Sequence, residues 1–252
     1  MMARAAVSTS EAECTDAVVT LKMQTDLAHR RESMYGYRAA THPVAVVAHE
    51  KSSQTGGVHI EMMAERGIAV DHSTVHRWAI KLLPVLEKAF RRCKRPVGRS
   101  WRMDETYVKV RGQWKYLYRA VDKAGNTVDF LLRAHRDKAA ARRYFEKAID
   151  RNGAPETVTM DKSEANLAAL QAINAERETP IKVRQVKYLN NVVEQDHRAI
   201  KRRIRPMMGF KDFRCARIIL PGIETMHMIS KGQMKDAAVT RTAAAQLHSL
   251  IS

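Results

Sequence analysis

Three acidic side chains stand where carboxylates in a protein can do chemistry: Asp104, Asp161 and Glu194. Asp104 lies inside a strand-like run, and a buried carboxylate is costly unless it is paired or binds a metal. Asp161 comes directly after the short apolar run 157–160, and ligand sites in α/β sheets favour the carboxyl ends of strands. Glu194 lies in the first turn of a predicted helix that could dock on the same sheet. We therefore expect these three carboxylates to converge.

Such a group of carboxylates, with no cysteine among them, would form a hard, all-oxygen metal site. Oxygen ligands select Mg²⁺ or Mn²⁺ over zinc. Two such ions about 3.5–4 Å apart can activate a water or a 3′-hydroxyl and stabilise the leaving oxygen when a phosphodiester is displaced. The sequence thus indicates metal-dependent chemistry on a nucleic-acid backbone.

Each acid also has an ordinary structural interpretation. Asp104 could be a surface residue, and Asp161 could cap the helix that follows it. Glu194 could simply favour the dipole of its own helix. Other acids compete for the same roles: Asp122, Glu105, Glu164 and Asp196. If the first strand is regular, Glu105 should face away from Asp104.

The charge of the whole chain favours the same class of substrate. The 252 residues include 44 lysines and arginines against 27 aspartates and glutamates, which gives a net charge of +17. An excess of this size attracts a polyanion, most commonly nucleic acid, and argues against an ordinary metabolic enzyme. No stretch reaches ~18 consecutive apolar residues, so we expect no membrane-spanning helix. The three cysteines are odd in number and far apart, which excludes a disulfide framework and favours a reducing, cytosolic compartment.

The elements that must position the acids alternate between strand and helix. Three strand-like runs joined by short turns come first, and helices and strands then follow one another. The expected strands are 101–110, 114–121, 127–132, 157–161 and 182–188, and the expected helices are 137–150, 163–178 and 191–205. This order predicts an α/β fold in which a mixed five-stranded sheet is flanked by helices.

Two segments before this core carry residue types that bind DNA. Residues 58–92 read as a helix that stops at Gly67, a short turn and a second, capped helix, which is the helix-turn-helix pattern. In that motif the first residues of the second helix reach base edges, and here they are His72, Ser73, Thr74, His76 and Arg77. An ordinary helical hairpin would give the same pattern. In the basic run that follows, we expect Arg91 and Arg92 to contact phosphates, the alternative being a solvated linker.

The last helix of the predicted core carries basic side chains beside its acid. His197 and Lys201 share a helix face with Glu194. Arg198 and Arg202 add positive charge to the same helix. We expect these four side chains to bind DNA next to the carboxylates.

Five stretches, taken together and in order, resemble one known family: 62–78, 103–110 (MDETYVKV), 114–122, 187–198 (KYLNNVVEQDHR) and 222–226. The similarity covers residues 59–234 and is to the DDE transposases of bacterial insertion sequences, most closely those of insertion-sequence family six. It implies an RNase H-like catalytic core, a divalent metal, and cut-and-join chemistry on DNA ends. It places the family's two aspartates on Asp104 and Asp161, its glutamate on Glu194, and a basic residue that contacts terminal DNA on Lys201.

The resemblance also implies partners and an organisation of the chain. The partners would be the terminal inverted repeats of the element and its target DNA, bound by a homodimer or a higher oligomer, with no membrane involved. The location would be the bacterial cytoplasm, in association with the nucleoid. The expected parts are a poorly patterned, disordered or altered segment 1–57, a helix-turn-helix region 58–92, a basic linker 93–100, a catalytic domain 101–234 and a tail 235–252.

Two departures from the family pattern and two other functions stay open. The stretch between Asp161 and Glu194 is slightly short, and residues 37–57 lack the helical periodicity of the family's DNA-binding unit. An inactive DNA-binding relic or regulator would keep the basic surface without turnover. A nuclease of the same fold would hydrolyse DNA without joining it.

Overall fold

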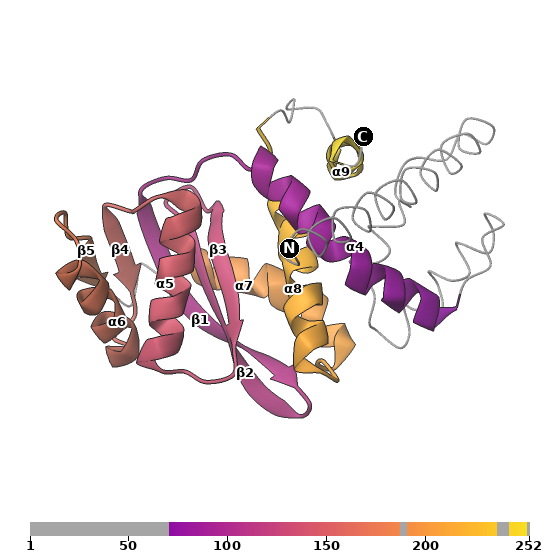
Figure 1. The fold of residues 1–252 in the computed structure, drawn as a ribbon, viewed down its shortest axis with the longest axis horizontal. Helices are drawn as coiled ribbons and strands as arrows, with labels where there is room; N and C mark the ends of the chain where they lie inside the picture. The colour runs from indigo at the N-terminus through magenta and orange to yellow at the C-terminus, as the bar shows by residue number, and fades with distance from the viewer. Residues whose placement is uncertain (1–70, 187–190, 236–241, 251–252) are drawn as a thin grey trace, which may run out of the picture. The chain divides into compact units, whose positions relative to one another are not determined.

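The structure is a computed structural model, and it describes residues 71–186, 191–235 and 242–250 (Figure 1). The segment 1–57 and the first helix of the predicted helix-turn-helix lie outside the described residues. The internal contacts divide the chain into two compact units, residues 95–216 and residues 1–94 together with 217–252.

The unit 95–216 is built on the predicted mixed sheet. Its strands are β1 (Ser100–Val110), β2 (Gln113–Asp122), β3 (Thr127–Arg133), β4 (Thr157–Met160) and β5 (Lys182–Gln185). They lie in the order β3-β2-β1-β4-β5. The pairs β1–β2 and β2–β3 are antiparallel, and the pairs β1–β4 and β4–β5 are parallel. The mixed five-stranded sheet expected from the sequence is confirmed.

One face of this sheet is covered by α5 (Lys138–Asn152) and α6 (Glu164–Ala175) (Figure 1). The helix α5 begins after Asp137, whose side chain caps it by accepting a hydrogen bond from the Ala140 N–H at 2.7 Å. The apolar stripes of both helices pack on the sheet, and their fully buried members include Tyr144, Phe145 and Leu170. This burial contributes to the hydrophobic stabilisation of the unit.

The other face carries α7 (Asn191–Ile204), which the short 3₁₀ turn η2 (Arg205–Met207) follows. The buried residues of α7 recur at helical spacing: Val193, His197, Ile200 and Ile204. An ion pair fixes the helix on β2, since Arg119 Nη2 donates to Asp196 Oδ2 at 2.6 Å and both side chains are buried.

The strand β1 changes its buried face halfway along. Trp101 and Met103 are buried, and further on Thr106, Val108 and Val110 are buried instead. The strand itself is regular, because its pairing with β2 is unbroken from Trp101 to Val110, so the change means that opposite faces are covered at its two ends. The shift falls between Asp104 and Glu105, close to where the pairing of β1 with β4 ends at Arg102.

The second unit contains α4 (His72–Cys93), most of α8 (Phe213–Ser230) and α9 (Ala243–Ser249). The Asp71 side chain caps α4 by accepting from the Thr74 N–H at 2.6 Å. The helix α8 continues through Pro221 and Gly222, although proline and glycine commonly end a helix. Gly222 lies close against α4, because a Cβ there would lie 2.6 Å from Leu83 Cδ2 and the buried Leu83 side chain would have to move. None of the described helices is both long and apolar enough to cross a membrane.

Candidate active site

Three carboxylates meet at the end of β4. Asp104, Glu105 and Asp161 each offer one oxygen, and these oxygens lie within 4.8 Å of one another. The arrangement follows from the topology, because parallel neighbouring strands bring the middle of β1 and the carboxyl end of β4 to the same place. Two of the three acids that the sequence nominates, Asp104 and Asp161, are therefore brought together.

Glu105 joins the cluster from the face that carries α6. It stands opposite Tyr118 in the β1–β2 register, whereas Asp104 stands opposite Arg119. The two side chains thus start on different faces, as a regular strand predicts, and they still approach each other beyond the last β1–β4 pair. Glu105 Oε1 accepts hydrogen bonds from Asn166 Nδ2 at 3.0 Å and from Arg136 Nε at 3.2 Å.

Arg136 is a cation that the sequence analysis did not single out. Besides its bond to Glu105, its Nη2 lies 3.7 Å from Asp161 Oδ2, so one guanidinium spans two of the three carboxylates. Arg136 stands just before the cap of α5, a position that carries no sequence signal. Asn166 was also missed, although a wholly buried amide on the apolar face of α6 is itself a signal.

Asp104 is the most perturbed acid of the cluster. Burial first, and then the charges of Glu105, Asp161 and Glu194, raise its pKa to about 7. His197 Nδ1 lies 3.6 Å from Asp104 Oδ2. Burial and the nearby Arg119 and Lys201 lower the pKa of His197 to about 3, so the ring is neutral near pH 7 and gives Asp104 no counter-charge.

Glu194 approaches the cluster without joining its tightest part. It is exposed in the first turn of α7 and is not among the described carboxylates that lie within 4.8 Å of one another. Its negative charge nevertheless acts on Asp104 and raises the pKa of that carboxyl. The structure thus brings Glu194 into the neighbourhood of the two aspartates and places Glu105 closer to them.

The chemistry of this donor set fits a hard divalent cation. All the ligand atoms on offer are carboxylate oxygens, which Mg²⁺ and Mn²⁺ prefer. A desolvated Asp104 among like charges is stabilised by any cation that binds there, because the attraction offsets the cost of burial.

The rival acids have structural tasks. Asp122 accepts from the backbone N–H groups of Gly98, Ala124 and Asn126, each at 2.9 Å, and so closes the turn after β2. Asp196 forms an ion pair with Arg119. Asp161 has a partly structural role as well, since its Oδ1 accepts from the Ser163 N–H at 3.2 Å ahead of α6.

The residues expected to bind DNA from α7 are divided between surface and interior. Lys201, Arg198 and Arg202 are exposed. His197 is 5% exposed and faces Asp104 instead of solvent.

The residues expected to bind DNA from α4 are partly engaged within their own helix. Arg77 Nη2 donates to Thr74 Oγ1 at 3.0 Å, and Ser73 Oγ donates to Asp71 Oδ2 at 3.0 Å. Arg91 pairs with Glu87 at 3.0 Å. Arg92 is exposed, His76 is half-buried, and the side chain of His72 lies outside the described residues.

Comparison with known proteins identifies the family. A family model described as a DDE domain matches residues 98–233. The chain is 38% identical over 172 residues to the transposase for insertion sequence-like element IS431mec of Staphylococcus aureus, covering 68% of this chain and 75% of that one. The chain belongs to the DDE transposases of insertion-sequence family six. The transposase is also 37% identical over 172 residues, with the same coverage, to the transposase for insertion sequence element IS257 in transposon Tn4003 of S. aureus.

Solved structures similar to this transposase include retroviral integrase cores. The HTLV-2 integrase catalytic core domain in complex with magnesium (trimeric form) aligns with a TM-score of 0.43 and 17% identity, over 61% of this chain and 97% of that one. The catalytic core domain of BIV integrase aligns with a TM-score of 0.40 and 15% identity, over 60% of this chain and 95% of that one.

Proposed function

We propose that this transposase binds Mg²⁺ or Mn²⁺ through Asp104, Asp161 and Glu194 and uses it to cleave the ends of its element and join them to target DNA. The observation that carries the proposal is the state of Asp104. This carboxyl is desolvated, crowded by other acids and touched by a neutral histidine, so its environment favours a bound cation.

Both steps of the reaction are displacements at phosphorus. A water attacks first, the strand breaks at the element end, and a 3′-hydroxyl is released. That hydroxyl then attacks a target phosphodiester, forming one phosphorus–oxygen bond as another breaks. When bound, the metal would supply the positive charge that activates the attacking oxygen and stabilises the leaving oxygen.

The side chains around the carboxylates keep them in place for these steps. Arg136 holds Glu105 and Asp161 toward each other, and Asn166 fixes the other side of Glu105. His197 packs on Asp104 as a neutral ring. Lys201, exposed two turns after Glu194, is suited to contact a phosphate of the terminal DNA.

The proposal extends to the partners and to the remaining parts of the chain. We infer that residues 58–92 form the helix-turn-helix that recognises the terminal inverted repeats, joined by the basic linker 93–100 to the catalytic domain 101–234, with 235–252 as a tail. Two ends must be held together for joining, which calls for at least a dimer on DNA. Association with the bacterial nucleoid would follow from the charge of +17.

A strand-transfer assay with DNA carrying the element's own terminal repeats tests the proposal. Substitution of a residue that only supports a metal's direct ligands lowers activity roughly 10–100-fold. Because we propose Asp104 as a direct ligand, Asp104→Asn should reduce the yield of joined DNA by more than this. Glu164→Gln is the matched control, because Glu164 is an exposed acid at the start of α6 outside the carboxylate cluster. Wild-type activity in Asp104→Asn would refute the assignment.

One observation favours a second candidate, an inactive DNA-binding relic. Glu194 stands outside the tight group of described carboxylates, and Arg136 already neutralises part of that group. A relic would bind the same DNA ends with wild-type affinity but yield neither cleaved nor joined products in Mg²⁺ or Mn²⁺. Cleaved products without joined ones would identify a nuclease of the same fold.

A further inference from the structure

A groove of about 730 Å³ lies beside the candidate active site, on elements of the same unit. The end of the β1–β2 hairpin forms one wall, and α7 with the segment after it forms the other. This segment is held against β1 by two backbone hydrogen bonds, from the Phe210 N–H to the Lys109 carbonyl at 2.8 Å and from the Arg111 N–H to the Phe210 carbonyl at 2.7 Å. Gly209 makes the approach possible, because a Cβ there would lie 2.8 Å from the Lys109 carbonyl oxygen.

The hairpin wall of the groove is aromatic and exposed. Tyr107 is 47% exposed and Trp114 is 61% exposed. Their ring centroids lie 6.5 Å apart at 77°, and the ring of Tyr116 lies 5.4 Å from that of Tyr107. Since β3 pairs with β2 only from Tyr116 onward and β4 leaves β1 at Arg102, the end of the hairpin extends beyond its neighbours in the sheet. Large aromatic faces left open to water mark a binding surface.

The groove also carries positive charge. Lys109 comes from the hairpin, Lys201 from α7 and Arg205 from η2, and all three line the same space. No acidic side chain is among its lining residues in the described part of the chain. Flat aromatic faces for bases and cations for phosphates are the two components of a site for unpaired nucleic acid.

One of the residues that line the groove has a buried polar atom without a partner among the described residues. Thr106 lines the groove and is 3% exposed, and its Oγ1 has no hydrogen-bond partner among the described residues. A buried hydroxyl without a partner is unfavourable, so a ligand that supplies a donor or an acceptor gains by reaching it. The edge of a nucleobase offers both kinds of group.

We propose that this groove binds unpaired nucleotides of the DNA strand that enters the active site. The bases stack on Trp114 and Tyr107, and the phosphates lie on Lys109 and Lys201. The position of the groove supports this, because Thr106 is two residues from Asp104 on β1 and Lys201 is two turns from Glu194 on α7. The inference rests on the proposed function for the origin of the strand, whereas binding itself needs no catalysis.

Fluorescence anisotropy of the full chain in EDTA, with labelled 12-nucleotide oligo(dT) and a 12-base-pair duplex as probes, tests the groove directly. Trp114→Ala should weaken oligo(dT) binding about 10-fold, within the range that loss of one stacking aromatic produces. Trp114→Phe should keep most of the affinity, because it keeps a ring. Duplex affinity should change less than about 2-fold in both variants, since paired bases hide their faces. Val186→Ala, which removes an exposed apolar side chain outside the groove, is the control and should bind like the wild type.

The outcomes separate this proposal from the catalytic one. Equal affinities of wild type and Trp114→Ala for oligo(dT) would overturn the proposal that the groove binds unpaired nucleotides. Equal losses of affinity for the single strand and for the duplex would overturn it as well. A change in oligomeric state in Trp114→Ala without a loss of oligo(dT) binding would make the groove a contact between copies of the chain, which also overturns the proposal. Asp104→Asn should bind oligo(dT) like the wild type, so a failure of the catalytic assignment leaves this result intact.

Discussion

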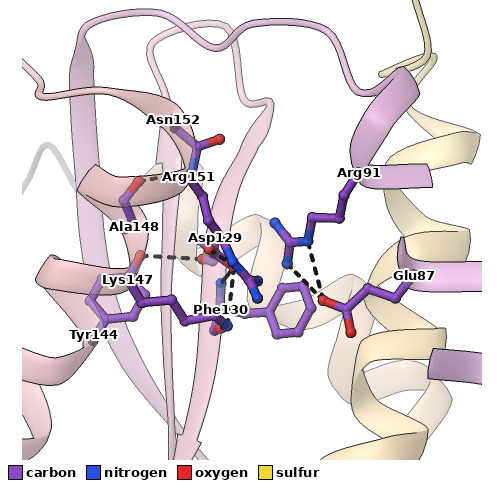
Figure 2. Close-up of polar contacts among 9 residues, drawn as sticks. All are labelled: Glu87, Arg91, Asp129, Phe130, Tyr144, Lys147, Ala148, Arg151 and Asn152. Atoms are coloured by element: carbon purple, nitrogen blue, oxygen red, sulfur yellow. Dashed lines mark hydrogen bonds and ion pairs between the residues drawn. The ribbon is translucent and has the colours of Figure 1, made fainter. Parts of the chain in front are cut away.

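Two carboxylates lie in strands of the same sheet and meet opposite surroundings: Asp129 in β3 and Asp104 in β1. Figure 2 shows Asp129 enclosed by cations from α5, with Lys147 Nζ at 3.4 Å and Arg151 Nη1 at 3.7 Å. Its Oδ1 also accepts from the Phe130 N–H at 2.8 Å. Asp104 instead has acids for neighbours and a neutral His197 at 3.6 Å.

The contacts around Asp129 also fix α5 on β3. Tyr144 Oη donates to the Asp129 carbonyl at 3.2 Å, and Lys147 Nζ donates to the Phe130 carbonyl at 2.6 Å while lying 5.1 Å from the centre of the Phe130 ring (Figure 2). The charge of Asp129 is balanced within the chain, whereas that of Asp104 calls for a cation from outside. The difference separates a carboxylate that holds the fold from one that is available for chemistry.

The largest stability change that this comparison predicts is for Asp129→Asn. The substitution leaves Lys147 and Arg151 beside a neutral side chain in a buried place, which costs about 3 kcal/mol. The free energy of unfolding from urea titration measures it. The same type of change at an exposed position of α5, Asp150→Asn, is the control and should change the free energy of unfolding by less than about 0.5 kcal/mol. A loss in Asp129→Asn no larger than in the control would show that the cations do not depend on this carboxylate.

For Asp104→Asn we expect the opposite effect, a higher free energy of unfolding than that of the wild type. The pKa of Asp104 is raised from 3.8 to about 7 in the folded chain, so its ionised form disfavours folding. The variant should therefore equal the wild type in stability below about pH 4, gain as the pH rises toward 7, and keep a constant advantage above that. We expect an advantage of about 2 kcal/mol, roughly half of what about 1.4 kcal/mol per pKa unit gives, because the Asp104 side chain is 21% exposed and water screens its charge. Urea titrations from pH 4 to pH 8 in EDTA would measure this difference. A variant that is less stable than the wild type at pH 8 contradicts the account.

The contrast between the two aspartates could be read from the sequence only in part. The turns at Arg111–Gly112 and after Asp122, with the strand and helix periods between them, were enough to predict the sheet and its order of elements. The convergence of Asp104 and Asp161 followed, because adjacent parallel strands end at one edge. The surroundings of each carboxylate did not follow, since they come from distant residues.

Arg136 and Asn166 reach Glu105 from elements far along the chain, and no local pattern in the sequence indicates that Glu105 is their partner. The change of buried face in β1 likewise depends on helices far along the chain, because α5 and α6 cover one face and α7 covers the other. The continuation of α8 through Pro221 goes against the local preference of proline and glycine to end a helix, and Gly222 lies against the Leu83 side chain of α4, a contact between residues far apart in the chain.

The smallest expected effect is the change in the free energy of unfolding when Mg²⁺ binds. It can be measured in variants of both aspartates, Asp104 and Asp129. At a free Mg²⁺ concentration ten times the dissociation constant, a folded-state site raises the free energy of unfolding by about 1.4 kcal/mol. We expect this rise in the wild type and in Asp129→Asn, whose carboxylate cluster is intact, and not in Asp104→Asn. Thermal unfolding with Mg²⁺ and with EDTA measures it in all three proteins.

The rise in the free energy of unfolding that Mg²⁺ causes should also depend on pH. Because protons compete with metal for a carboxyl whose pKa is about 7, the stabilisation by Mg²⁺ should be smaller at pH 6 than at pH 8. The same rise in Asp104→Asn as in the wild type would place the cation elsewhere on the molecule. Stabilisation by Mg²⁺ could instead be lost in Asp129→Asn under conditions where that variant is still folded. Such a loss would mean that the two carboxylates are not independent. The contacts between α5 and Asp129 would then also be needed to keep Arg136 and the carboxylate cluster in position.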